Sequence, residues 1–405
     1  MRYRGTGTPP DREALERLDA IWAAAAALAD VDVLVAANLQ TRFLIEALRV
    51  QEPGRLAAGL AMHVRSVAIE GTQSLARARR LLETARPSVE FVRTPYVQAM
   101  FSIAEQVLHI SERRWDEGLA CLDQAEDLLR RDCTGVYWEL SLLHMSRLAA
   151  LRTRGDHAAI TSFVGGVLTE ARQRGDIFTQ ARLGILVEPD AHVCADRPRD
   201  ARVAIRRIRA EWLRGDFPVQ LMLAGAADFT VDLYMGHGWA AYRRITRYWP
   251  FLKRSLFMRV EMIRALAHQY RAAAALTASE ERPSDRAQLL ASARRDIARL
   301  DREHDEQWQI AAETLRAAVA CHEGDTDQTL ARLERARLWW DQARMPSYAT
   351  AIRRYQALIR GGPDRSAIVQ ETDAWFLAAG IHNPARYTAL HLMGFPRGLV
   401  DRSSS

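Results

Sequence analysis

The sequence lacks the motifs of the common catalytic families. It contains no GxxxxGK[ST] phosphate-binding loop, no GxSxG nucleophile turn and no HExxH metal-binding pair. A protein kinase needs a lysine on its third strand, an HRD loop and a DFG metal site. Lys253 is the only lysine, and the other two motifs are missing. We therefore predict that the protein is not an enzyme and binds no cofactor.

Cysteine pairs and long apolar runs are also missing. The cysteines Cys121, Cys133, Cys194 and Cys321 are scattered without a CxxC pair, which favours free thiols in a reducing compartment. The His–Cys neighbours supply at most two ligands in one place, so we expect no metal site. No run is long enough to span a membrane, and residues 1–12 lack the apolar core of a signal peptide. These features predict a cytoplasmic protein that does not enter a membrane.

The net charge of +6 is small for 405 residues and does not indicate a nucleic-acid partner. Nearly all the basic residues are arginine, a bias that a GC-rich genome produces without functional meaning. Charge therefore gives no evidence for nucleic acid, and a protein partner is the stronger expectation.

Turn signals divide the sequence into helical segments at regular intervals. Apolar residues that repeat at three and four positions follow each turn, as Leu119, Leu122, Ala125 and Leu129 follow residues 113–116. Glycine ends a helix because it accepts the left-handed conformation, and Asp or Thr caps the next helix. The turns begin at residues 71, 113, 155, 196, 236, 283, 324 and 362, so the intervals are 42, 42, 41, 40, 47, 41 and 38 residues.

An interval near 41 residues holds two helices of about fifteen to eighteen residues and two turns. This pattern predicts an all-α fold, a tetratricopeptide-like helical-hairpin solenoid with longer helices than the common unit of about 34 residues. We expect a flexible tail at residues 1–10, a helical-repeat superhelix over residues 11–396, and a second tail at residues 397–405.

Prolines should fall mainly between the helices, because a proline inside a helix removes a hydrogen bond and clashes with the preceding turn. Pro87 and Pro189 belong to this expected group. Pro250 is the exception, and we expect it to kink or end a helix after Trp249.

Arginine alternates with aromatic residues over residues 242–254. Such a surface can grip phosphate, an acidic peptide or a nucleic acid. The same pattern also arises when the aromatic rings are core and the arginines solvate the outer face. Two adjacent tryptophans pose the same alternative, because only one of them can point into the core. The candidate partner-binding residues are Tyr242, Arg243, Arg244, Arg247, Trp249, Arg254, Trp339 and Trp340.

Several stretches resemble the C-terminal helical-repeat region of large multidomain bacterial serine/threonine protein kinases, the type found in myxobacteria and planctomycetes. The most specific are CTGVYWE at residues 133–139 and GIHNPARYTALHLMGF at residues 380–395. Further similar stretches lie at residues 36–62, 113–140, 236–267 and 344–362. The resemblance implies a sensing or scaffolding region. In those kinases a catalytic domain precedes it, whereas here helices are expected from about Asp11, so catalysis would reside elsewhere whether the chain is freestanding or part of a longer protein.

The leading hypothesis is a non-enzymatic regulatory scaffold that binds a protein partner through a helical-repeat groove. The partner would be a kinase or another signalling protein of a bacterial signalling or stress-response pathway. The alternative is a ligand-sensing domain that binds an anionic small molecule or nucleic acid through residues 242–254.

Overall fold

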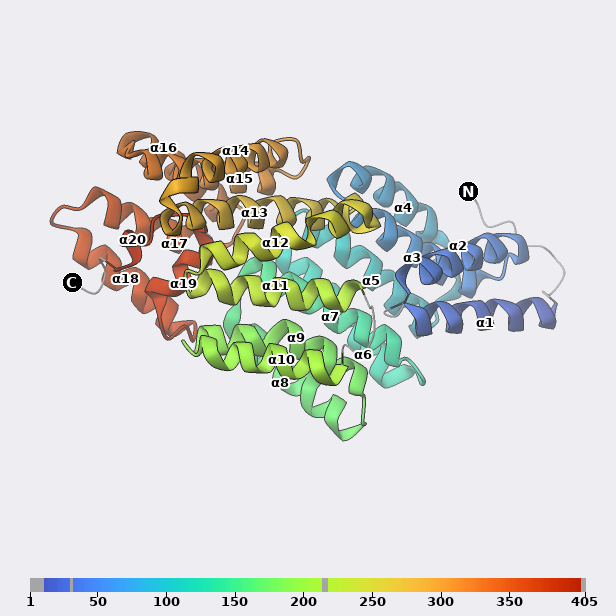
Figure 1. Ribbon diagram of the computed structural model, residues 1–405. Helices are drawn as coiled ribbons and strands as arrows, with labels where there is room; N and C mark the ends of the chain where they lie inside the picture. Colours follow the sequence, from blue (N-terminus) through green and yellow to red (C-terminus); the bar gives the residue numbers. More distant parts are fainter. Residues whose placement is uncertain (1–10, 30–31, 213–217, 402–405) are drawn as a thin grey trace. The chain divides into compact units, whose positions relative to one another are not determined.

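Helices make up most of the described chain, which contains no strand. The computed structural model describes residues 11–29, 32–212 and 218–401 (Figure 1). The all-α prediction is confirmed for these residues, and the predicted tail at residues 1–10 lies outside them. The chain divides into two compact units, residues 1–150 and 151–405. The sequence interpretation had treated residues 11–396 as one array.

The helices of the first unit are α1 (Arg12–Leu28), α2 (Val33–Val50), α3 (Pro53–Ile69), α4 (Leu75–Val92), α5 (Pro95–Ser111), α6 (Trp115–Asp132) and most of α7 (Tyr137–Arg154). The helices that follow are α8 (His157–Gln173), α9 (Ile177–Cys194), α10 (Pro198–Trp212), α11 (Pro218–Tyr234), α12 (Gly238–Arg254), α13 (Glu261–Glu281), α14 (Arg286–Leu300), α15 (Glu306–Glu323), α16 (Thr326–Gln342), α17 (Pro346–Arg360), α18 (Arg365–Ala378), α19 (Pro384–His391) and α20 (Gly398–Asp401). Short 3-10 helices, η1 (Thr72–Ser74), η2 (Leu256–Arg259) and η3 (Pro283–Asp285), precede α4, α13 and α14.

Helices that follow one another along the chain pack side by side. In the first unit α1 packs on α2, α3 on α4 and α5 on α6, and in the second α9 packs on α10, α12 on α13 and α15 on α16. Helices two positions apart also touch, as α3 touches α5, α9 touches α11 and α13 touches α15. Successive helix pairs therefore stack on one another within each unit.

The predicted turns lie between helices, and each interval encloses two of them. Gly155, Asp196, Gly236 and Gly324 follow α7, α9, α11 and α15, and all four have left-handed backbones with φ between 52° and 82°. Asp325 accepts a hydrogen bond from the Gln328 N–H at 2.9 Å and so caps α16 as the sequence suggested. The regular spacing thus marks the end of every second helix.

Among the described residues, three prolines lie in the interior of helices, and two of them contradict the prediction. Pro87 lies within α4 and Pro189 within α9, so the expectation that they separate helices is wrong. Pro250 does not end a helix either, because α12 continues to Arg254. A proline removes one main-chain hydrogen bond, and the packed face of a long helix can outweigh that loss.

Small residues allow the helices of the second unit to approach closely. In α13 the run Ala272, Ala273, Ala274 and Ala275 is fully buried, because α12, α14 and α15 all pack against this helix. Gly238 begins α12 at such an approach. A Cβ atom at Gly238 would lie 2.5 Å from the main-chain nitrogen of Ala278.

We expect Gly238→Ala to lower the free energy of unfolding by about 1–3 kcal/mol, because the added methyl forces α12 away from α13. The matched control is Gly165→Ala on the exposed face of α8, where no atom lies within 4 Å of the added Cβ. That change should raise stability by up to about 1 kcal/mol through helix propensity. Urea titration followed by circular dichroism measures both, and equal stability of the two variants would contradict the close approach.

Candidate functional site

Residues 380–397, named here the C-terminal segment, lie against the ends of four helices of the second unit. The His382 N–H donates to the Cys194 carbonyl at the end of α9, at 2.8 Å. Arg397 donates from Nη2 to the Met235 carbonyl after α11, at 2.6 Å, and from its main-chain nitrogen to Glu280 of α13, at 3.0 Å.

His322 near the end of α15 makes the fourth contact, donating from Nε2 to the Gly394 carbonyl at 2.8 Å. The last carbonyls of a helix have no partner within the helix, so they are ready acceptors for a neighbouring chain. The C-terminal segment donates to main-chain carbonyls at two of the four helix ends and to the Glu280 side chain at a third. Arg397 and α20 fall in the stretch that the sequence assigned to a tail, and residues 402–405 lie outside the described part.

Asp196 anchors the start of the C-terminal segment. Its carboxylate accepts hydrogen bonds from Asn383 Nδ2 at 2.9 Å, from Tyr234 OH at 2.7 Å and from Arg386 Nη1 at 3.3 Å. Burial alone would raise the pKa of Asp196, but the Asn383 and Tyr234 hydrogen bonds and the Arg386 charge together hold that pKa below its usual value. The ionised carboxylate therefore fixes α19 against the turn after α9.

The helix α19 inserts aromatic side chains among the helices of the second unit. Tyr387 is 7% exposed, and its hydroxyl lies 2.7 Å from His157 Nε2 at the start of α8. His391 packs edge-on against Tyr348 of α17 and Phe376 of α18, with ring centroids 4.6 Å and 6.1 Å away. Long-range aromatic contacts therefore hold this short helix, in addition to its main-chain bonds.

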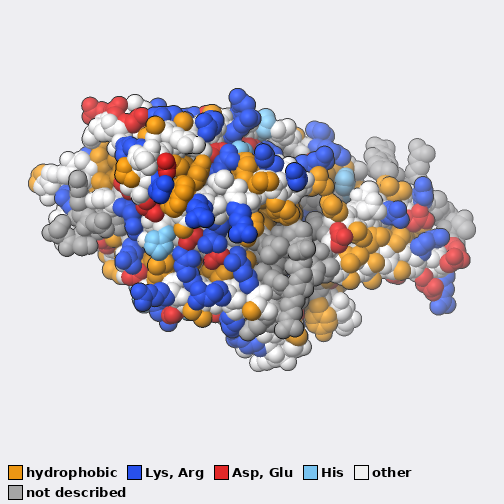
Figure 2. All heavy atoms as spheres, in the orientation of Figure 1, with side chains coloured by type: hydrophobic (Ala, Val, Ile, Leu, Met, Phe, Trp, Pro, Cys, Tyr) orange, Lys and Arg blue, Asp and Glu red, His pale blue; other side chains and the backbone are white. Residues whose placement is uncertain are grey.

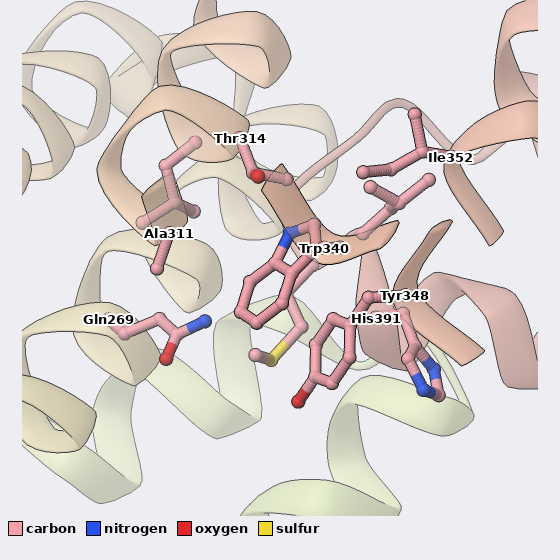
Figure 3. A pocket seen from close by; sticks show the side chains of 10 residues that line it. Gln269, Ala311, Thr314, Trp340, Tyr348, Ile352 and His391 are labelled. Carbon is pink, nitrogen blue, oxygen red and sulfur yellow. The ribbon is translucent and has the colours of Figure 1, made fainter. Parts of the chain in front are cut away.

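A cavity of about 160 Å³ lies beside α19. Helices α7, α8, α9, α11, α13, α17 and α19 contribute to its wall. The polar side chains that line it are Arg152, His157, Asp190, Thr230, Gln269, Tyr270, Tyr348, Tyr387 and His391. A smaller void of about 10 Å³, drawn in Figure 3, shares Gln269, Tyr348 and His391 with the cavity and is also lined by Trp340.

The charged groups of the cavity are Arg152 and Asp190. Arg152 Nη1 lies 2.5 Å from Asp190 Oδ2 and donates to the Leu186 carbonyl, also at 2.5 Å. The Leu186 carbonyl lies one residue after Ile185, whose carbonyl has no helical donor because Pro189 lacks an N–H. Mainly because of the Asp190 charge, the pKa of Arg152 is raised, so its guanidinium stays charged.

Burial keeps the other titratable groups of the cavity neutral. It lowers the pKa of His157, and it is the main cause that lowers the pKa of His391 to about 3. It raises the pKa of Tyr348 to about 12 and also raises the pKa of Tyr270. At neutral pH the cavity therefore holds one ion pair, neutral imidazoles and phenolic hydroxyls.

The arginines of the predicted surface at residues 242–254 differ in their contacts. Arg243, Arg247 and Arg254 are exposed, and none of them has an ion-pair partner among the described residues. They lie on one face of α12, since their spacing of four and seven residues follows the helix repeat. Figure 2 shows Lys and Arg side chains gathered over this part of the second unit. Arg244 instead bonds Asp232 at 3.0 Å and Asp228 at 3.2 Å, both buried.

The aromatic candidates of α12 take part in internal contacts. The Tyr242 hydroxyl donates to Ser292 Oγ at 3.2 Å. The Trp249 ring lies beneath the Arg271 guanidinium, 3.4 Å from its central carbon to the ring centroid. These contacts place both rings between helices, so of the candidate residues on α12 only Arg243, Arg247 and Arg254 are exposed and without an ion-pair partner in the described part.

The tryptophan pair also divides as the sequence argument required. Trp340 is 4% exposed and stacks on Tyr348 with 4.3 Å between ring centroids. Trp339 is half-buried and meets Trp340 edge-on, at 4.9 Å and 86°. Trp340 therefore belongs to the wall of the smaller void.

Sequence reasoning missed the cavity and the C-terminal segment as a docked element. Each cavity residue occupies an ordinary helical position. The one local irregularity in the sequence is Pro189, which interrupts the helical pattern next to Asp190. The stretch at residues 380–395 was singled out for its resemblance to kinase-linked repeats, but its spatial role was not inferred.

Comparison with family models, curated proteins and solved structures finds no match for the chain. Within the described ranges, no group of three or more His, Cys, Asp or Glu side chains is placed to hold a metal ion. None of the helices in those ranges combines the length and apolar character needed to cross a bilayer.

We expect acid to loosen α19. The pKa of His391 is about 3 in the folded chain and near 6.5 when unfolded. Below about pH 6.5 the unfolded state therefore binds more protons, and stability falls as the pH falls toward 3. Hydrogen exchange at residues 384–391, corrected for the intrinsic rate, should be faster at about pH 5 than at about pH 7.

The variant His391→Gln should flatten this pH dependence, because it removes the titrating ring. His382→Gln is the matched control, since His382 is exposed and only its main chain bonds Cys194. An unchanged pH dependence in His391→Gln would show that protonation of His391 does not govern α19.

Proposed function

We propose that this chain is a non-enzymatic, tetratricopeptide-like regulatory scaffold with repeats near 41 residues. It binds a segment of a protein partner along the helix ends to which its own C-terminal segment is bonded. The observation that carries the proposal is that segment itself. Residues 380–397 are bonded to α9, α11, α13 and α15, so these helix ends already hold a stretch of polypeptide.

The chemistry of these contacts suits peptide recognition. Main-chain carbonyls at the ends of α9 and α11 accept hydrogen bonds from the docked segment. Such carbonyls can accept hydrogen bonds from partners of different sequence. Asp196 adds selectivity, because it accepts from a side-chain amide and a guanidinium. A partner segment with similar groups would compete with the C-terminal segment for the same helix ends.

The regulatory role follows from this competition. The docked state covers the helix ends, and release of the C-terminal segment uncovers them for the partner. The resemblance to kinase-linked repeats supports a kinase or other signalling protein as that partner. The free cysteines support a cytoplasmic location.

Cleavage of the folded chain tests whether docking is reversible. A protease site in the exposed turn at residues 361–364 would separate α18–α20 after the whole chain has folded. We expect the labelled fragment to dissociate and rebind with a micromolar dissociation constant, measured by fluorescence anisotropy. A fragment that never dissociates would mean that the segment is a permanent part of the fold, which contradicts the proposal.

Variants of the fragment test the contacts themselves. Asn383→Ala and Arg397→Ala should each weaken rebinding by about tenfold, because each removes a hydrogen bond that involves a charged group. His382→Ala is the control and should rebind normally, since the His382 side chain is exposed. Equal affinity of all the variants would show that these bonds do not hold the segment.

One observation favours a second function, the binding of an anionic ligand or nucleic acid by α12. Arg243, Arg247 and Arg254 form an exposed basic stripe without acidic partners among the described residues. The triple change of these arginines to glutamate should abolish binding to single-stranded nucleic acid and remove its salt dependence. Arg244 must be kept, because its loss would leave Asp228 and Asp232 with less compensation. Nucleic-acid binding is measured by filter retention over a series of salt concentrations. If the triple variant binds unchanged, the three arginines are not the binding site.

A further inference from the structure

We propose that the cavity beside α19 binds a small organic carboxylate with an apolar or aromatic body. The carboxylate would accept hydrogen bonds from the Arg152 guanidinium and from the hydroxyls of Tyr270 and Tyr348. This site is distinct from the helix ends that hold the C-terminal segment, and it requires no protein partner.

The size of the cavity limits the ligand. Its volume of about 160 Å³ is close to that of an engineered protein cavity, about 150 Å³, that accepts benzene. A single aromatic ring or a short branched chain with one charged group therefore fits, whereas a nucleotide does not. The remaining space would hold ordered water at the polar wall.

Unused donors converge on the cavity. No described residue hydrogen-bonds to the hydroxyl of Tyr270 or of Tyr348, although both line it. The Arg152 bonds to Asp190 and Leu186 both use Nη1, which leaves Nε and Nη2 for another acceptor within the described part. Donor atoms that reach a cavity without a protein partner can bond a ligand there, and each such bond adds to the ligand's affinity.

The three donors come from α7, α13 and α17 and line the same cavity. Burial raises the pKa of Tyr270 and that of Tyr348. Burial keeps both phenols protonated, so each hydroxyl can donate throughout the physiological pH range. A guanidinium and two phenolic hydroxyls match the oxygen lone pairs of a carboxylate.

The charge balance favours a carboxylate over a phosphate. Asp190 already compensates the Arg152 charge, so the cavity offers little net positive charge. A doubly charged phosphate would be poorly compensated there, whereas a monoanion of low charge density costs less to desolvate. The hydroxyl and guanidinium donors remain available to it.

Part of the cavity wall is apolar. Phe229 stacks on the Tyr270 ring with 4.5 Å between centroids and 12° between planes. Leu233, Leu266 and Leu390 also line the cavity. These side chains would bury the body of the ligand, and removal of its apolar surface from water favours binding.

The ligand would also touch α19, because Tyr387, Leu390 and His391 belong to that helix and line the same cavity. Anything that binds the closed arrangement stabilises it by mass action. Occupation of the cavity would therefore hold the C-terminal segment in place, which gives a small metabolite control over the helix ends.

Benzoate is the first probe, tested on the full-length chain by isothermal titration calorimetry. We expect a dissociation constant in the millimolar range or tighter, and weaker binding of the neutral isostere benzamide. Tyr270→Phe combined with Tyr348→Phe should weaken benzoate binding by about tenfold, because it removes two hydrogen-bond donors and keeps both rings. Tyr248→Phe, an exposed tyrosine of α12, is the matched control and should bind as the unmodified chain does.

Hydrogen exchange on the unmodified chain provides a second measurement that does not depend on the folding of a variant. Benzoate should slow exchange at residues 384–391, whereas benzamide should have a smaller effect. The proposal is overturned if acetate, benzoate and phenylacetate all fail to bind at about 10 mM. This concentration lies well above the dissociation constant expected for the complex. Equal binding of benzoate by the double variant, or of benzamide by the unmodified chain, would overturn it as well.

Discussion

The bonds between one C-terminal segment and the ends of α9, α11, α13 and α15 organise the second unit. Helix ends leave carbonyl groups without donors, and stacking alone does not satisfy them. The His382 N–H and the Arg397 guanidinium donate to main-chain carbonyls at two of these ends. At the other two ends, the Glu280 carboxylate accepts from the Arg397 main-chain N–H and the His322 imidazole donates to the Gly394 carbonyl. The position of α19, the burial of Tyr387 and the part of the cavity wall that α19 forms all depend on this arrangement.

The regular part of the fold could be predicted because its causes are local. A glycine such as Gly236 that accepts a left-handed backbone, an aspartate such as Asp325 that caps the next helix, and apolar residues every three or four positions determine where each helix begins and ends. Prolines were misjudged for the same reason. Pro189 costs one local hydrogen bond, and tertiary packing, which a local pattern does not report, carries α9 through it.

The site could not be predicted because its causes are long-range. Asp196 and Asn383 are separated by 187 positions, and Tyr387 and His157 by 230. Each of Arg152, Tyr270 and Tyr348 fits the pattern of apolar and polar residues in its own helix. The sequence therefore gives no sign that the three lie in one cavity. The Arg-rich pattern of α12 was visible, but only the structure separates Arg243, Arg247 and Arg254 from Arg244, which is bonded to Asp228 and Asp232.

The contacts of residues 380–397 also bear on how the second unit deforms. Stacked helix pairs touch mainly their neighbours, so small rotations between successive pairs accumulate along the stack. A segment that spans the ends of α9, α11, α13 and α15 couples those rotations and restrains extension. Loss of these hydrogen bonds would remove that restraint, so we expect the helix stack to lengthen and twist more easily.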